Sequence, residues 1–207
     1  MVSSNAVPYS FDSPDIKMKL NILHAVDRSL EKITVAEICK NAGISRQTFY
    51  RHFESKFDIP WWYTIYARQF YLDEIGRSID WGMGYYQHLR LICKELEFFQ
   101  KSLQFSINSP YGRTILPVHR QQILFKTLTE YRKIKLDNNM VFLVEHYSKL
   151  ENEVINEWLR SGSEPDLKCW TEDLVSLVPR RLYIALSMRD DLPTGKSTIN
   201  AWNVKGK

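Results

Sequence analysis

Apolar residues recur at spacings of three and four along most of this chain, which is the period of an amphipathic α-helix. The first such stretch begins at Ser13-Pro14-Asp15, where a serine cap, a first-turn proline and an acidic residue together mark a helix start. Longer helices are predicted over residues 56–77, 85–104, 117–133, 138–160 and 166–186, with a break at Gly82 and Gly84. The pattern predicts an all-α fold.

Residues 33–45 predict the end of one short helix and the start of another. Thr34 and Glu37 have the spacing of a capping box, in which each side chain bonds the other residue's backbone N–H. Gly43 can adopt the left-handed conformation that ends a helix, and Ser45 can cap the next one. Two short helices around a glycine-containing turn have the geometry of a helix-turn-helix.

The helix capped by Ser45 has two faces of different chemistry. Ile44, Phe49 and Phe53 fall on an apolar face. The opposite face consists of Arg46, Gln47, Tyr50 and Arg51. Arginine can bond guanine, glutamine can bond adenine and an aromatic ring can contact a thymine methyl group, so this face suits a DNA groove. The alternative is an ordinary amphipathic surface helix, and the caps and glycine turn favour the DNA-reading interpretation.

The segment from Ile33 to Ile59 resembles the DNA-binding signature of TetR/AcrR-family regulators. The residues that carry the resemblance are Thr34-Val35-Ala36-Glu37-Ile38, Ala42-Gly43-Ile44-Ser45, Thr48-Phe49-Tyr50-Arg51-His52-Phe53 and Ser55-Lys56. The resemblance implies a three-helix DNA-binding unit followed by an α-helical ligand-binding and dimerisation domain. It also implies a homodimer, which would bind a pseudo-palindromic site on double-stranded DNA.

Within this segment, the resemblance implies that Tyr50, His52 and Lys56 contact phosphates and that residues 46–50 contact bases. The predicted DNA-binding residues are therefore Thr34, Ser45, Arg46, Gln47, Thr48, Tyr50, Arg51, His52 and Lys56. Pro60 departs from the family pattern, which usually has an ordinary helix former at this position. It either kinks the following helix or is tolerated in its first turn.

The resemblance also suggests how the chain is divided. A helix-turn-helix DNA-binding domain is predicted over residues 13–58, and a helical ligand-binding and dimerisation domain over residues 59–188. Residues 1–12 and 189–207 are predicted to be flexible termini. The ending Trp158-Leu159, followed by Gly162, further resembles the penultimate helix of a Firmicutes-type subgroup.

Apolar stripes on the last two predicted helices suggest a four-helix bundle between two subunits. The predicted interface residues are Leu143, Tyr147, Leu150, Val154, Trp158, Leu174, Val178, Arg181 and Leu182. The alternative is that these stripes are buried within one subunit.

Aromatic residues make up 13% of the chain and concentrate in the helices predicted after residue 56. Such side chains can line an apolar cavity between helices, where a histidine could orient a polar group. The predicted ligand-binding residues are Trp62, Tyr66, Phe70, Tyr86, His88, Phe99 and Phe125. The expected ligand is small and planar or apolar. The alternative is that each aromatic residue belongs to the core.

Composition limits the function classes without identifying one. The net charge of +4 is too small to indicate nucleic-acid binding by itself. Cys39, Cys93 and Cys169 lie far apart within helical patterns and are interpreted as buried, reduced thiols of a cytoplasmic protein. A membrane-spanning helix needs about 20 consecutive apolar residues, and the chain has no such run.

Motifs of catalysis are also missing from the sequence. The histidines lack metal-ligand spacing, and the chain contains no nucleophile elbow, phosphate-binding loop or dinucleotide fingerprint. Glu151 and Glu153 are interpreted as solvated charges. We therefore expect no enzymatic activity, metal or cofactor. The predicted function is a ligand-responsive, dimeric repressor with an unidentified small-molecule effector. The alternative is a TetR-like coactivator that acts through a protein partner and a small-molecule signal without binding DNA.

Overall fold

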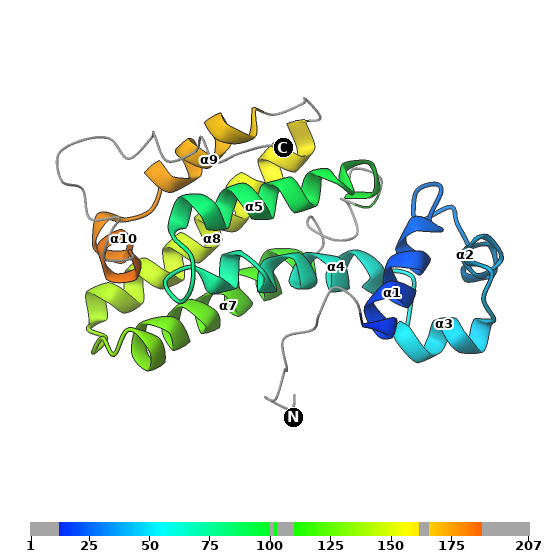
Figure 1. Cartoon of the computed structure of the whole chain (residues 1–207), viewed down its shortest axis with the longest axis horizontal. Helices are drawn as coiled ribbons and strands as arrows, with labels where there is room; N and C mark the ends of the chain where they lie inside the picture. Colours follow the sequence, from blue (N-terminus) through cyan, green and yellow to red (C-terminus); the bar gives the residue numbers. More distant parts are fainter. Residues whose placement is uncertain (1–12, 100–101, 103–109, 162–165, 188–207) are drawn as a thin grey trace. The chain divides into compact units, whose positions relative to one another are not determined.

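The computed structural model describes residues 13–99, 102, 110–161 and 166–187, so the predicted flexible termini lie outside the described part. The described residues are mostly α-helical and form no β-strand, which confirms the predicted all-α fold (Figure 1). They divide into two compact units. The first contains the described residues up to Tyr66 and those of Lys94–Gly112, and the second contains Ala67–Cys93 and the described residues from Arg113 onward.

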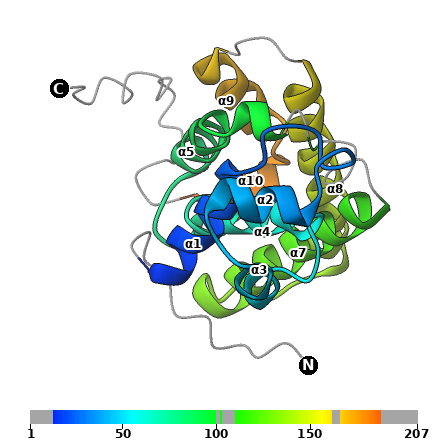
Figure 2. The ribbon, with the colours of Figure 1, turned by 90° about the vertical axis from the view of Figure 1, so that its right-hand side faces the viewer.

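The first unit contains the three helices predicted for a helix-turn-helix. Helices α1 (Pro14–His24), α2 (Val35–Ala42) and α3 (Arg46–His52) contact one another (Figures 1 and 2). Ser13 caps α1 by accepting a hydrogen bond from the Ile16 backbone N–H at 3.2 Å. The core of this unit is apolar and includes Ile16, Ile22, Leu23, Leu30, Ile33, Ile38, Phe49, Phe53 and Ile59.

Helix α4 (Asp58–Gln69) begins in the first unit and is shorter than predicted. Pro60 is its third residue, where the backbone N–H has no partner within the helix in any case, so the proline is tolerated in the first turn. A 3₁₀ turn follows at Leu72–Glu74, and Gly76 then takes a positive φ of 79°. The predicted continuation to residue 77 is therefore wrong, because the chain turns at a glycine that readily adopts this conformation.

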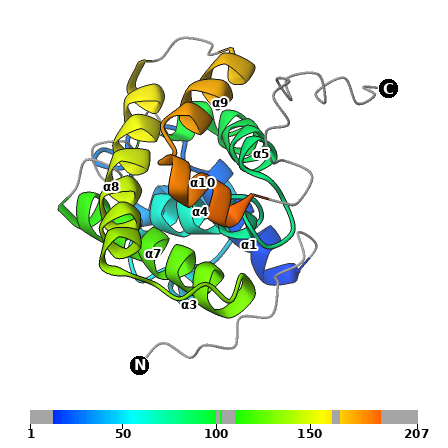
Figure 3. The same cartoon turned by 90° about the vertical axis from the view of Figure 1, so that its left-hand side faces the viewer.

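The second unit contains most of the remaining helices, while the helical residues 96–99 belong to the first unit (Figure 3). The helices of the second unit are α5 (Trp81–Cys93), α7 (Pro110–Lys126, in this unit from Arg113), a π-helical turn (Thr127–Tyr131), α8 (Asn138–Ser161), α9 (Leu167–Ser176) and α10 (Arg180–Leu186). Helix α5 packs against α9, and α10 packs against α8 and the π-helical turn. Helices α5 and α7 each begin earlier than predicted from the sequence.

The predicted break at Gly82 and Gly84 is wrong, because both glycines lie inside α5. At Gly84, glycine is needed for close packing and not for a turn. A Cβ atom added there would lie 2.4 Å from the side chain of Ile75, so only glycine lets α5 approach this segment so closely.

The single helix predicted over residues 166–186 is also wrong. Helix α9 ends at Ser176 and α10 begins at Arg180, with Pro179 at its N-cap. Proline has no backbone N–H and its ring clashes with the preceding helical turn, so the chain changes direction there.

The cysteine interpretation needs one correction. Cys39 is buried and Cys93 is partly buried, but Cys169 is exposed on α9. All three are free thiols. In the part of the chain that the structure describes, no helix combines the length and apolar character needed to span a bilayer.

Candidate functional site

The turn between α2 and α3 sets the direction of α3 within the first unit. Gly43 has φ 66° and ψ 34°, the left-handed conformation expected of a helix-ending glycine. The backbone N–H of Ile44 donates to the Cys39 carbonyl at 2.9 Å, which closes the turn. Ser45 then caps α3, because its Oγ accepts from the Thr48 backbone N–H at 3.0 Å.

The start of α2 is held by the predicted capping box. The Thr34 Oγ1 accepts from the Glu37 backbone N–H at 3.2 Å, and the Thr34 backbone N–H donates to Glu37 Oε2 at 2.8 Å. Arg28 also forms an ion pair with this carboxylate. The hydrogen bonds from Thr34, together with Arg28, lower the pKa of Glu37 to about 2. The carboxylate therefore remains ionised at neutral pH and the box stays formed.

Helix α3 buries one face and exposes the other. Phe49 is 0% exposed and Phe53 is buried beside it, with ring centroids 6.0 Å apart. Arg46, Gln47, Tyr50 and Arg51 are exposed on the opposite side, Tyr50 at 56%. The exposed row therefore presents two guanidinium groups, an amide and a phenol to solvent, which are groups that bond base edges and phosphates.

The other predicted DNA-binding residues have bonds within the first unit. Thr34 and Ser45 are helix caps, and Thr48 Oγ1 lies 2.9 Å from Ser45 Oγ. The His52 ring is largely buried, and its Nδ1 lies 2.9 Å from Asp15 Oδ1. Lys56 Nζ donates to the Ile33 carbonyl at 2.7 Å, which ties the start of α4 to the loop before α2. These residues hold the exposed face of α3 in position.

The structure buries five of the nine predicted dimer-interface residues within a single chain. Tyr147, Trp158, Leu174, Val178 and Leu182 are all less than 9% exposed within a single chain, so their side chains are unavailable to a second subunit. The burial within one subunit that the sequence left open as an alternative applies to them.

The remaining predicted interface residues are accessible. Leu150 is 44% exposed, Leu143 and Val154 are partly exposed, and Arg181 bonds Asp137 at 2.6 Å on the surface. Phe142 on α8 and Ile184 on α10, which the sequence reasoning missed, are 54% and 45% exposed.

The predicted ligand-binding residues are divided between the two units, and several are core residues. Trp62 stacks on Tyr66 with centroids 5.2 Å apart, and buried Phe99 packs against Tyr63 at 5.4 Å, all in the first unit. For Tyr66 and Phe99, the core interpretation therefore applies.

In the second unit, Phe70, Tyr86 and Phe125 are partly buried and His88 is 1% exposed. Burial lowers the pKa of His88 to about 3, so the ring is neutral at neutral pH. Tyr86 lines a small hollow of about 10 Å³ with Lys168, Thr171 and Glu172. Sites for drug-sized ligands usually have at least about 300 Å³, so this hollow is too small for one.

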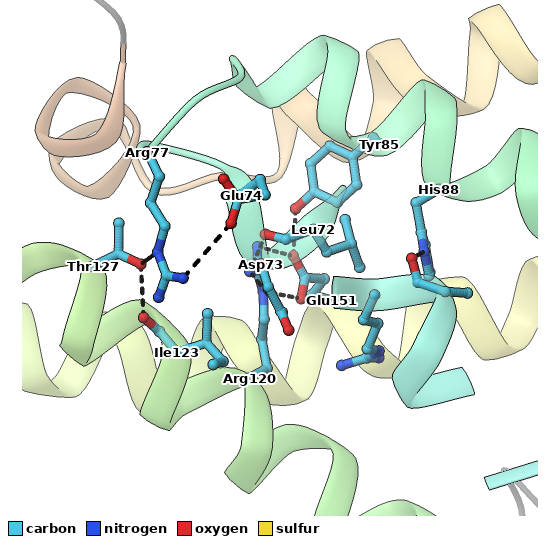
Figure 4. A network of polar contacts seen from close by, with 12 residues as sticks. Leu72, Asp73, Glu74, Arg77, Tyr85, His88, Arg120, Ile123, Thr127 and Glu151 are labelled. Carbon is cyan, nitrogen blue, oxygen red and sulfur yellow. Dashed lines mark hydrogen bonds and ion pairs between the residues drawn. The ribbon is translucent and has the colours of Figure 1, made fainter. Parts of the chain in front are cut away.

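A buried polar cluster in the second unit was missed by the sequence reasoning (Figure 4). Arg120 Nε donates to Glu151 Oε2 at 2.8 Å and Arg120 Nη2 donates to Glu151 Oε1 at 3.1 Å. The Tyr85 hydroxyl donates to Glu151 Oε1 at 2.6 Å and also contacts the Tyr147 hydroxyl. Arg120 Nη1 donates to the Leu72 carbonyl at 2.6 Å.

The interpretation of Glu151 as a solvated charge is therefore wrong, since its side chain is 0% exposed. Burial alone would lower the pKa of Arg120, but the neighbouring Glu151, Tyr85 and Asp73 together outweigh burial and raise it. The pair is charged and internal. A signal was present in the sequence, because polar residues occupy core positions of α8 at helical spacing. These buried residues are Ser148, Glu151, Asn152 and Asn156.

Comparison with known families bears on the first unit. Residues 25–59 match the family model described as bacterial regulatory proteins, tetR family. The matched residues contain α2, the glycine turn, α3 and the first residues of α4. The match supports a DNA-binding transcriptional regulator of the TetR type. No curated protein matches the chain.

Proposed function

We propose that the chain is a sequence-specific DNA-binding regulator that acts as a ligand-responsive, dimeric repressor in the cytoplasm and has no enzymatic activity. The observation that carries the proposal is the exposed row Arg46, Gln47, Tyr50 and Arg51 on a helix that is capped, set by a glycine turn and anchored by Phe49. A dimer would place two such helices on successive half-sites about one helical turn of DNA apart. We also propose that the chain belongs to the Firmicutes-type subgroup whose penultimate helix it resembles.

Selection of binding sites from random duplex DNA tests the proposal directly. We expect enrichment of a pseudo-palindrome, with affinity that falls as salt rises because bound phosphates release counterions. A selection that enriched no symmetric site would contradict the proposal and favour the coactivator alternative. One observation favours that alternative: His52 and Lys56, expected on phosphates, have partners inside the first unit.

Substitutions on α3 should separate base reading from phosphate binding. Arg46→Ala or Gln47→Ala should relax the preference at particular base pairs by about 1–3 kcal/mol, the value of a good bidentate contact. Lys56→Ala should instead weaken binding to all sequences and reduce the salt dependence by about one phosphate contact. Fluorescence anisotropy on the selected site and on single-base variants measures both effects.

Two controls accompany this comparison. Circular dichroism checks the fold of Lys56→Ala, because that lysine also bonds the Ile33 carbonyl. Arg90→Ala removes an exposed arginine from α5 and should change neither property. If all three variants of the first unit lost affinity equally at every site, the division into base and phosphate contacts would be wrong.

We further propose that the dimer forms through the exposed apolar residues of α8 and α10. Phe142 and Leu150 are two helical turns apart on α8, and Phe142 stacks on the His146 ring at 4.0 Å. We expect Leu150→Glu to convert the dimer to a monomer in sedimentation experiments, since a charge would be buried at the interface. Val118→Glu, at a residue of α7 that is 40% exposed, is the matched control. A Leu150→Glu protein that remained dimeric would exclude this surface.

A further inference from the structure

Arg68, at the end of α4, is a buried cation without an ion-pair partner in the described part of the chain. The residue is 2% exposed. Its Nη2 donates to Asn152 Oδ1 at 3.2 Å, while Nε and Nη1 have no hydrogen-bond partner among the described residues. Buried guanidinium groups usually pair with a carboxylate, because a buried donor without a partner is destabilising, and more so when it is charged.

Glu151, one of two carboxylates that act on Arg68, is already engaged. Glu151 receives two hydrogen bonds from Arg120 and one from Tyr85, so its oxygens have their partners. Burial lowers the pKa of Arg68, and the charge of Glu151 acts in the opposite direction, which places the two groups within electrostatic reach. Arg120 therefore bonds a carboxylate, whereas Arg68 bonds none among the described residues.

Asn152 adds a further open donor next to Arg68. Because its Oδ1 accepts from Arg68, the orientation of the amide is determined, and its Nδ2 has no partner among the described residues. Asn152 is 1% exposed. Three nitrogen donors on two contacting side chains thus lack an acceptor, in a position where nearly all polar groups of proteins are bonded.

We propose that Arg68 and Asn152 bind the carboxylate of a small organic acid, and that this acid is the effector of the regulator. The role of the acid as an effector rests on the proposed function, whereas the binding of the carboxylate does not. A carboxylate offers two acceptor oxygens, and its hydrogen bonds with a guanidinium are among the stronger ones in proteins. The open N–H donors of Arg68 and Asn152 could all donate to such a carboxylate. A ligand group that is itself a donor would leave them without an acceptor.

The charges around the cluster disfavour a ligand with more than one negative charge. Arg68 and Arg120 are formally balanced by Glu151 and by Asp73, which is 5% exposed and influences the Arg68 pKa. Burial lowers the pKa of His88 to about 3 and also lowers the pKa of His119, so neither ring adds positive charge at neutral pH. A phosphate, with close to two charges, would be poorly compensated in this interior. A monocarboxylate is the better fit.

Matched acids and amides test the carboxylate directly on the full-length protein. Benzoate and hexanoate are compared with benzamide and hexanamide, and with inorganic phosphate, by thermal shift and calorimetric titration. We expect both acids to raise the melting temperature, and the amides and phosphate to have no comparable effect. Binding of the amides with equal affinity, or no binding by either acid at millimolar concentration, would overturn the proposal.

Variants then assign the binding to these residues. Arg68→Met keeps much of the side-chain length and removes the donors, and should weaken acid binding about ten- to hundredfold, the loss of a charged hydrogen bond. Asn152→Leu should weaken acid binding less than Arg68→Met does. If Arg68→Met does not fold, Asn152→Leu tests whether the acid binds at this position. Arg90→Met, at an exposed arginine of α5, is the control and should bind the acids normally. Equal binding by all variants would overturn the assignment.

DNA binding is measured separately on the same proteins. Arg90→Met should bind the selected DNA site as the unaltered protein does, and the acid should change the DNA affinity of both, but not that of Arg68→Met. If the acid bound through Arg68 and no variant bound DNA, the carboxylate site would stand and the proposed regulatory function would fail. If acid binding were Arg68-dependent but left DNA affinity unchanged, the effector role would be overturned, since linkage requires each ligand to change the other's affinity.

Discussion

Arg120→Met is expected to lower the free energy of unfolding of the second unit by about 3–5 kcal/mol, the cost of breaking a buried ion pair. The substitution removes both hydrogen bonds to Glu151 and the one to the Leu72 carbonyl. The Glu151 carboxylate would remain 0% exposed with only the Tyr85 hydroxyl bonded to it. Urea denaturation followed by circular dichroism measures the change.

A double variant distinguishes the ion pair from simple packing. Arg120→Met combined with Glu151→Met replaces both charges by apolar groups of similar length, and should recover much of the lost stability, because the desolvation cost then disappears. Arg90→Met, at an exposed site, should change the free energy of unfolding by no more than about 0.5 kcal/mol. A double variant as unstable as Arg120→Met would show that the pair matters through its shape and not its charge.

Phe49→Ala is expected to destabilise the first unit by about 3–5 kcal/mol, the usual range for a large aromatic residue removed from a core. Phe49 is 0% exposed and packs against Phe53, so its loss leaves a cavity where α3 meets the rest of the unit. Hydrogen exchange of the backbone amides in α2 and α3 measures the effect locally. DNA binding should be lost with it, because the exposed face of α3 would no longer be held in place.

The neighbouring aromatic residue provides a matched control. Tyr50 is 56% exposed and contacts Phe49 edge to face at 5.4 Å. Tyr50→Ala should leave amide exchange in α2 and α3 nearly unchanged, yet lower the affinity for DNA. Should Tyr50→Ala destabilise the unit as much as Phe49→Ala, the division of α3 into a core face and a binding face would be incorrect.

Features that depend on residues close together along the chain could be predicted without the structure. The capping box of Thr34 and Glu37, the left-handed Gly43 and the Ser45 cap were predictable because each bond joins residues at most a few positions apart. The two faces of α3 follow from the helical period alone. For Pro60 the sequence left a kink and a first-turn position open, and the structure places it in the first turn of α4.

The partners of each buried side chain depend on the tertiary structure and could not be predicted from the sequence. An apolar stripe such as Tyr147 and Trp158 has the same period whether it packs in its own chain or against a second one. The sequence therefore left both a dimer interface and burial within one subunit open, and the structure buries these two residues within one chain. The Glu151 carboxylate has a partner 31 positions away, in Arg120 on another helix, and no local pattern brings them together. Arg68 and Asn152 are 84 positions apart. Their open donors arise because folding removes both side chains from water, while the residues that the structure describes supply no acceptor for these donors.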